Sequence, residues 1–129
     1  MVSKERFEQG MTLQQYIDHM SVNRERFVDA LDETTIGPED TRVLAQLGKV
    51  RRVLVLSEDW CGTCLAHVPY VAKLVESNAS IEMRLFPRDQ NPDVMDQYLK
   101  RGLYRSIPVF VFFDEHMNEV TRFIETRPA

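Results

Sequence analysis

The chain has 129 residues, and its 43% hydrophobic content is enough for one buried core, so we expect a single domain over residues 1–129. Sixteen lysines and arginines against twenty aspartates and glutamates give a formal net charge of -4, which argues against nucleic-acid binding and an acidic-lipid anchor. No segment approaches the roughly 18 consecutive apolar residues of a membrane helix, and residues 1–10 lack the apolar core of a secretion signal. We therefore expect a cytoplasmic protein with no membrane or nucleic-acid partner.

The first part of the chain is predicted to be helical. Residues 12–32 carry apolar side chains mostly three and four positions apart, the spacing of an amphipathic helix, with an interruption near Ser21. Thr12 and Gln15 have the spacing of a capping box at its start. Residues 1–36 are therefore predicted to form an N-terminal helical extension, after which a second helix begins at Gly37-Pro38 and ends at Gly48.

The middle of the chain predicts a strand, a helix and a second strand. Residues 52–57 contain a continuous apolar run, at positions 53–56, which is typical of a strand buried on both faces and therefore of a parallel sheet. A helical pattern follows through Val75, and residues 81–86 predict the next strand. This order indicates a βαβ unit.

The last part predicts a helix and a hairpin. Asn91 begins a helix that is expected to run to about Arg101 and to end at Gly102. Residues 109–113 and 119–125 predict two antiparallel strands joined by a polar turn. The whole order predicts an α/β fold with a four-stranded mixed sheet, two parallel strands plus an antiparallel hairpin, flanked by helices.

The two cysteines lie together in Trp60-Cys61-Gly62-Thr63-Cys64, where the buried strand ends and a helix begins. Thiols three positions apart on a first helical turn can close a disulfide. The free amides and the dipole at a helix N-terminus stabilise a thiolate, so Cys61 is the predicted nucleophile. Cys64, one turn further, is the predicted resolving thiol. Gly62 is expected to keep the turn uncrowded, and Trp60 to shield one side of the sulfur pair.

Two other interpretations of the cysteine pair stay open. The first is a structural disulfide or an inert buried pair. The second is a metal site, with His67 as a third ligand or with the cysteines of two chains around zinc or an iron-sulfur cluster. Because two cysteines in one chain cannot complete a structural zinc site, no metal ligand is assigned.

The cysteine motif resembles the active-site signature of the thioredoxin family, Trp-Cys-Gly-Pro-Cys, with Thr63 in place of the proline. Pro69 lies where thioredoxins have a proline inside the active-site helix. Ile107-Pro108-Val109 is similar to their Ile-Pro-Thr segment, in which the proline is cis. The resemblance covers about residues 38–125 and implies that they form a thioredoxin-like core.

The resemblance implies a thiol-disulfide oxidoreductase acting on protein disulfides, in the direction of reduction. It also implies regeneration by a thioredoxin reductase or a small-thiol electron donor, and no bound cofactor. In the family, the backbone before the cis-proline pairs with the extended substrate chain and the proline packs opposite the sulfurs. The substrate-binding residues that this implies are Trp60, Gly62, Thr63, Ile107 and Pro108.

The sequence departs from the family pattern at two positions on the predicted parallel strands. Thioredoxins have a buried aspartate on the central strand and a lysine on its neighbour, which together assist proton removal from the resolving cysteine; Val55 and Leu85 stand at these places. The joint loss is physically coherent, because either charge alone would be costly to bury. Glu58 is the nearest candidate, as a base acting through water.

A second departure concerns the terminal helix that covers one face of the sheet in thioredoxins. We expect the predicted helix at residues 12–32 to cover that face, because its apolar stripe must be buried.

A different function also stays open. The chain could be a non-catalytic partner-binding module on the same scaffold, with a regulatory or metal-binding cysteine pair.

Overall fold

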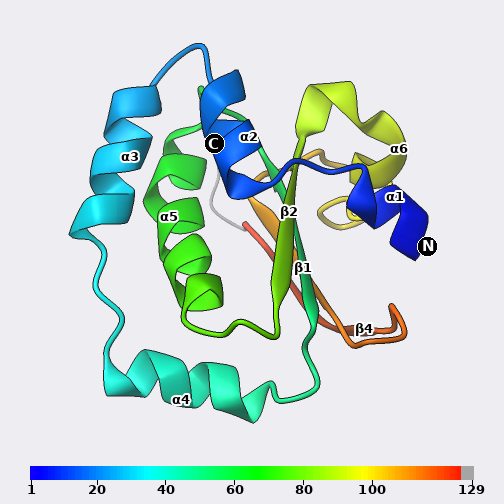
Figure 1. Ribbon diagram of the computed structural model, residues 1–129. Helices are drawn as coiled ribbons and strands as arrows, with labels where there is room; N and C mark the ends of the chain where they lie inside the picture. The colour runs from blue at the N-terminus through cyan, green and yellow to red at the C-terminus, as the bar shows by residue number, and fades with distance from the viewer. Residues whose placement is uncertain (126–129) are drawn as a thin grey trace.

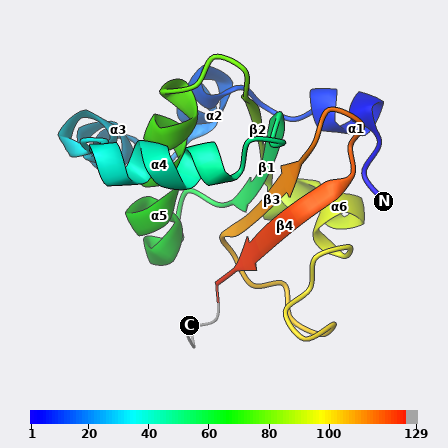
Figure 2. The same ribbon diagram turned by 90° about the horizontal axis from the view of Figure 1, so that it is seen from below.

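The structure, a computed structural model, describes residues 1–125 and contains a mixed sheet with helices on both faces (Figures 1 and 2). The strands lie in the order β2-β1-β3-β4, with β1 and β2 parallel and both other pairs antiparallel. This confirms the predicted mixed sheet of a parallel pair plus a hairpin. The strands are β1 (Arg52–Ser57), β2 (Glu82–Pro87), β3 (Val109–Phe113) and β4 (Glu119–Ile124).

The central strand β1 is buried along almost its whole length. Residues 53–57 are each 0% exposed, which explains why this segment reads as an uninterrupted apolar run. Val55 lies opposite Leu85 in the parallel register with β2. The two positions that hold a charged pair in thioredoxins are thus adjacent, buried and apolar in this chain. The central sheet therefore has no charge to assist a thiol at these places.

One face of the sheet carries the helix that follows the cysteines and three of the four helices that precede β1 (Figures 1 and 2). The helix predicted over residues 12–32 is two helices, because Asn23 adopts a left-handed backbone with φ 62° between them. The break lies at the interruption predicted near Ser21, and the Thr12–Gln15 capping box is present. These helices are α2 (Leu13–His19), α3 (Arg24–Glu33), α4 (Pro38–Gln46) and α5 (Gly62–Glu76).

Helix α3 packs beside α5 and not over the hairpin (Figure 1). Its apolar stripe is buried through Phe27, which is 1% exposed, and Leu31. On β4, however, Phe123 is 46% exposed. The expectation that this part of the chain replaces the terminal helix of thioredoxins is therefore wrong, because α3 buries its stripe against another helix.

The opposite face carries two short helices, α1 (Lys4–Glu8) and α6 (Pro92–Met95), next to the single turn η1 (Arg88–Gln90). Helix α1 was not predicted from the sequence. Its position is fixed by Arg6, whose guanidinium donates to Asp93 at 2.9 Å and to Asn91 at 2.8 Å. Five residues are too few for a stable isolated helix, so this one depends on tertiary contacts.

The helix predicted from Asn91 to about Arg101 ends at Met95 instead. The amides of Gln97 and Tyr98 bond three residues back, the tighter pattern of a helix end. Arg101 and Gly102 both have positive φ, so neither can continue a right-handed helix. Burial of Tyr98, which is 3% exposed, outweighs the helical preference of this segment.

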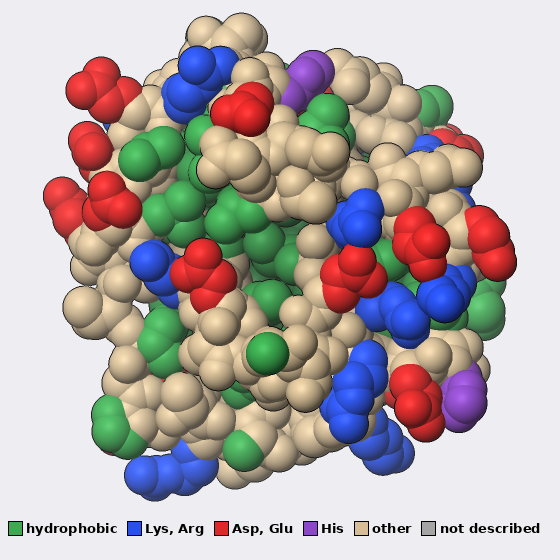
Figure 3. All heavy atoms as spheres, viewed as in Figure 1, with side chains coloured by type: hydrophobic (Ala, Val, Ile, Leu, Met, Phe, Trp, Pro, Cys, Tyr) green, Lys and Arg blue, Asp and Glu red, His purple; other side chains and the backbone are tan. Residues whose placement is uncertain are grey.

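The visible surface mixes both charges. Figure 3 shows acidic and basic side chains around a central band of hydrophobic ones, without an extended basic patch on that face. Among the described residues, 1–125, no helix has the length and apolar content needed to cross a membrane.

Candidate active site

The Cys61 sulfur caps the N-terminus of α5. Cys61 has an extended backbone, φ -85° and ψ 117°, between the loop after β1 and the first helical turn. Its Sγ accepts a hydrogen bond from the backbone N–H of Cys64 at 3.3 Å and lies 3.4 Å from Thr63 Oγ1. These groups stabilise a negative charge on sulfur better than a neutral thiol.

The two cysteines, both free thiols, have opposite ionisation. A hydrogen bond from the Cys64 thiol lowers the pKa of Cys61 to about 5, against the effect of burial and with help from Thr63. The same bond raises the pKa of Cys64, and burial raises it further. Cys61 is also the more exposed residue, at 7% against 2%. These opposite shifts favour the thiolate at Cys61 and the thiol at Cys64.

Thr63 is expected to tune the ionisation of Cys61. In Thr63→Val, which keeps the shape and removes the hydroxyl, the pKa of Cys61 should rise, because one stabilising hydrogen bond to the thiolate is lost. Alkylation by iodoacetamide near pH 5 should slow about threefold, as expected for the loss of a hydrogen bond of about 1 kcal/mol from a thiolate that is half ionised at this pH. At pH 8 the two proteins should react alike, since both are ionised. Equal rates at both pH values would contradict this role.

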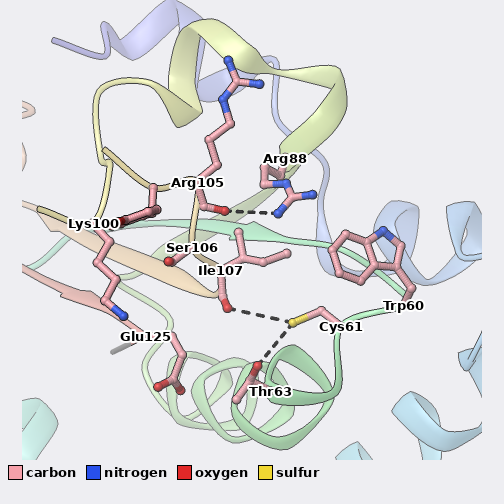
Figure 4. A pocket seen from close by; sticks show the side chains of 10 residues that line it. Trp60, Cys61, Thr63, Arg88, Lys100, Arg105, Ser106, Ile107 and Glu125 are labelled. Carbon is pink, nitrogen blue, oxygen red and sulfur yellow. Dashed lines mark hydrogen bonds between the residues drawn. The ribbon is translucent and has the colours of Figure 1, made fainter. Parts of the chain in front are cut away.

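A cavity of about 530 Å³ lies in front of Cys61 and reaches the loop that precedes β3 (Figure 4). Cys61 Sγ is 3.9 Å from the carbonyl oxygen of Ile107, although the two residues are 46 positions apart. Ile107 and Pro108 are buried, and the peptide bond between them is cis. The structure thus places Ile107 and Pro108 beside the cysteine pair.

Trp60 and Gly62 are both exposed at this site. Trp60 is 53% exposed, and the Arg88 guanidinium lies 5.0 Å from the centre of its indole ring. A Cβ added at Gly62 would meet nothing within 4 Å. The expectation that glycine is needed to keep the turn uncrowded is therefore wrong for the free protein. The open space at Gly62 is accessible surface next to the sulfur.

Charged residues that the sequence did not single out complete the cavity. Arg88 donates to the carbonyl oxygen of Arg105 at 3.1 Å, which ties η1 to the loop before β3. Glu125 is only 5% exposed, and its carboxylate lies 3.6 Å from Nε2 of His67 on α5. The residues that line the cavity come from separate elements (Figure 4), so no local pattern could have identified them. The charged lining residues are Arg88, Lys100, Arg105 and Glu125.

Glu58 lies in a second cavity, of about 350 Å³, and not in front of Cys61. Its carboxylate accepts a hydrogen bond from the backbone N–H of Asp89 at 2.8 Å, and burial raises the pKa of Glu58. Tyr16 and His19 of α2 line the same cavity. The candidate base is thus separated from the nucleophile and faces the N-terminal helices.

His67 and the cysteines do not assemble with further ligands in the described chain. Across residues 1–125, no three histidine, cysteine, aspartate or glutamate side chains lie close enough to hold a metal ion. His67 points to Glu125. The cysteine pair instead has the geometry of a thiolate with a neighbouring thiol.

Comparisons with known proteins identify a family and a shared fold. A family model described as thioredoxin matches residues 10–129 and so includes α2, α3 and α4. No curated protein matches the chain. Among solved structures, a protein of unknown function from Pseudomonas aeruginosa is 22% identical, with 96% of this chain and 77% of that chain covered and a TM-score of 0.77.

Two further solved structures are similar. An HIV epitope scaffold is 21% identical over 95% of this chain and 77% of its own, with a TM-score of 0.76. A thioredoxin from Fasciola hepatica is 29% identical over 67% of this chain and 79% of its own, with a TM-score of 0.48. The likeness to the first two structures, both below 25% identity, shows a shared fold.

Proposed function

The chain belongs to the thioredoxin family, and from this premise we propose that it is a thiol-disulfide oxidoreductase that reduces protein disulfides. Family and fold support a redox function in general. The observation that carries the specific proposal is the position of the pair: Cys61 Sγ lies at the N-terminus of α5 and accepts a hydrogen bond from the backbone N–H of Cys64 at 3.3 Å, and the Cys64 side chain is buried behind it. A structural disulfide or an inert buried pair does not require one cysteine at a helix N-terminus and the other buried behind it.

In the proposed first step, the Cys61 thiolate attacks one sulfur of a substrate disulfide. A bond forms between Cys61 and that sulfur, and the substrate's other sulfur leaves as a thiolate. The cavity before Cys61 provides access, and the Ile107 carbonyl at its base can pair with an extended substrate chain, with Pro108 next to it. Trp60, Gly62 and Thr63 form the side of this substrate site.

In the second step, Cys64 attacks Cys61 and releases the reduced substrate. The Cys61–Cys64 bond forms, the bond to the substrate breaks, and the proton of Cys64 must leave. We place Glu58 in this step as a base acting through solvent, because its carboxylate faces a cavity behind the motif and burial raises its pKa. The disulfide then needs two electrons, which we assign to a thioredoxin reductase or a small thiol.

Cysteine usage supports the direction of reduction. The chain has two cysteines, both in the motif, and therefore none to spare for a structural disulfide of the kind that secreted proteins use. We accordingly propose a cytoplasmic reductant that exchanges disulfides with proteins and holds no bound cofactor. The alternative, a partner-binding module with a regulatory pair, predicts binding without turnover.

An insulin-reduction assay with dithiothreitol as electron donor tests the proposal. The wild-type chain should accelerate the precipitation of insulin B chain well above the uncatalysed rate, and Cys61→Ser should reduce it to background, because no other residue supplies the nucleophile. Ser80→Ala, an exposed serine far along the chain from the motif, is the control and should keep full activity. A wild-type rate equal to that of dithiothreitol alone would favour the binding module.

A further inference from the structure

The Cys64 thiol is buried, and during resolution it must lose its proton. Only 2% of Cys64 is exposed, and it lies behind Cys61 on the first turn of α5. Once Cys61 is bonded to a substrate, its negative charge is gone, so that cause of the high pKa of Cys64 disappears. Burial remains. Because Val55 and Leu85 are apolar, these two strand positions offer no carboxylate or amine to take the proton.

Two buried hydroxyls connect Cys64 to the second cavity. Ser57, the last residue of β1, is 0% exposed, and its hydroxyl is close enough to the Cys64 thiol to lower the pKa of Cys64. The Ser57 hydroxyl lies 2.8 Å from the phenol oxygen of Tyr16, which comes from α2 and is 3% exposed. Tyr16 lines the cavity that also holds Glu58 and His19. His19 is exposed, so solvent reaches this cavity.

The active-site loop holds α2 and α3 against this cavity. The Asp59 carboxylate accepts hydrogen bonds from the backbone N–H groups of Ser21 and Val22, at 2.9 and 3.3 Å, and from the Ser21 hydroxyl. The Asn23 side chain donates to the backbone carbonyl of Asp59 at 2.9 Å. The residue before Trp60 thus fixes the turn between the two helices and with it the position of Tyr16.

We propose that Ser57 and Tyr16 form the outlet through which the Cys64 proton leaves when Cys64 resolves the mixed disulfide. This inference rests on the proposed function. The Cys64 proton passes to the Ser57 oxygen as the Ser57 proton passes to Tyr16 and the Tyr16 proton to solvent beside Glu58. Ser57 is the first group on this path; Tyr16 acts through Ser57 and is a positioning residue.

The surrounding charges suit a neutral relay. Burial raises the pKa of Tyr16, and the carboxylates of Asp59 and Glu58 act in the same direction, so the phenol stays protonated and can donate. The Ser57 hydroxyl and the backbone N–H of Glu58 both lower the pKa of Cys64. Cys61 and His19 are the other titratable groups next to this path.

Stopped-flow reaction with one equivalent of dithiobis(nitrobenzoate), DTNB, tests the outlet. The attack of Cys61 releases one thionitrobenzoate, and resolution by Cys64 releases the second. In Tyr16→Phe and Ser57→Ala, the second release should be about tenfold slower near pH 6, which corresponds to a rise of about one unit in the effective pKa of Cys64. The rate of the first release should be unchanged. The deficit should shrink toward pH 9, where hydroxide removes the proton directly. Glu58→Gln should slow the same phase less, since solvent also accepts protons.

The matched control is Tyr98→Phe, which removes the hydroxyl of another tyrosine that is 3% exposed but lies next to α6. It should resolve like the wild type. If the second release in Tyr16→Phe has the wild-type rate at every pH, the proposed proton path is refuted. It is also refuted if the release slows by the same factor at all pH values, because a purely structural change would have that effect. DTNB reacts with any accessible thiolate, so this comparison stays valid even if the insulin assay refutes the reductase.

Discussion

The Cys64→Ser variant is expected to stay covalently bound to its substrate. Cys61 keeps its place at the N-terminus of α5 and can still attack, but the thiol that breaks the mixed disulfide is gone. Multiple-turnover reduction of insulin should fall by at least about a hundredfold, as when one member of a group acting as a unit is removed. Mass spectrometry after acid quenching, without dithiothreitol, should show the protein plus one insulin molecule, whose two chains stay joined by the disulfide that was not attacked.

Cys61→Ser is the matched control for this experiment. It retains the buried Cys64, whose pKa is raised by burial, and should form no adduct within the same time. An adduct in Cys61→Ser and none in Cys64→Ser would reverse the roles of the two cysteines. Equal adducts in both would show that neither sulfur is selectively ionised, and the assignment based on the helix terminus would fail.

The Phe27→Ala variant is expected to lose about 3–5 kcal/mol of unfolding free energy, the usual cost of removing a buried phenylalanine. Phe27 is 1% exposed on α3, the helix that packs beside α5, and its ring centre lies 5.7 Å from that of Tyr16. Since small domains have only about 5–15 kcal/mol in total, the loss is a large share of stability. Urea unfolding should show a much lower midpoint.

Phe123→Ala provides the comparison, because it deletes the same atoms at a position that is 46% exposed on β4. Its midpoint should move far less than that of Phe27→Ala. If both variants unfold at the wild-type midpoint, α3 contributes little to the core. If Phe27→Ala also slows resolution by Cys64, the packing of Tyr16 is transmitted to the active site.

Elements with a strong local pattern were predicted correctly. Strand β1 appears as an apolar run because both of its faces are covered, and α5 follows the cysteines as expected. The helix after Asn91 was predicted too long, since burial of Tyr98 and the positive φ of Arg101 depend on the rest of the fold. Helix α1 was missed because the partners of Arg6 are more than 80 positions away.

The residues of the site also fall into two groups, those predicted from local spacing and those that depend on the fold. Cys61 and Cys64 were identified from spacing, since the contact between a helix N-cap and its first turn is local. The expected partner Glu58 was placed next to the motif in sequence, but its side chain lies in a different cavity from the nucleophile. Ser57 and Tyr16 gave no signal, because a serine at the end of an apolar strand and a tyrosine in an amphipathic helix both have ordinary structural roles.

The sequence by itself determined the mixed sheet, the junction of strand and helix that holds the cysteines, and which sulfur is held at the helix terminus. These features follow from the conformational preferences of neighbouring residues and from the regular spacing of apolar residues along the chain. Only the tertiary structure decided what surrounds the two sulfurs: Ile107 in front of Cys61, and Tyr16 with Ser57 behind Cys64. Those contacts join residues about 40 positions apart, and they exist because helices pack on a sheet in one register, which no local pattern encodes.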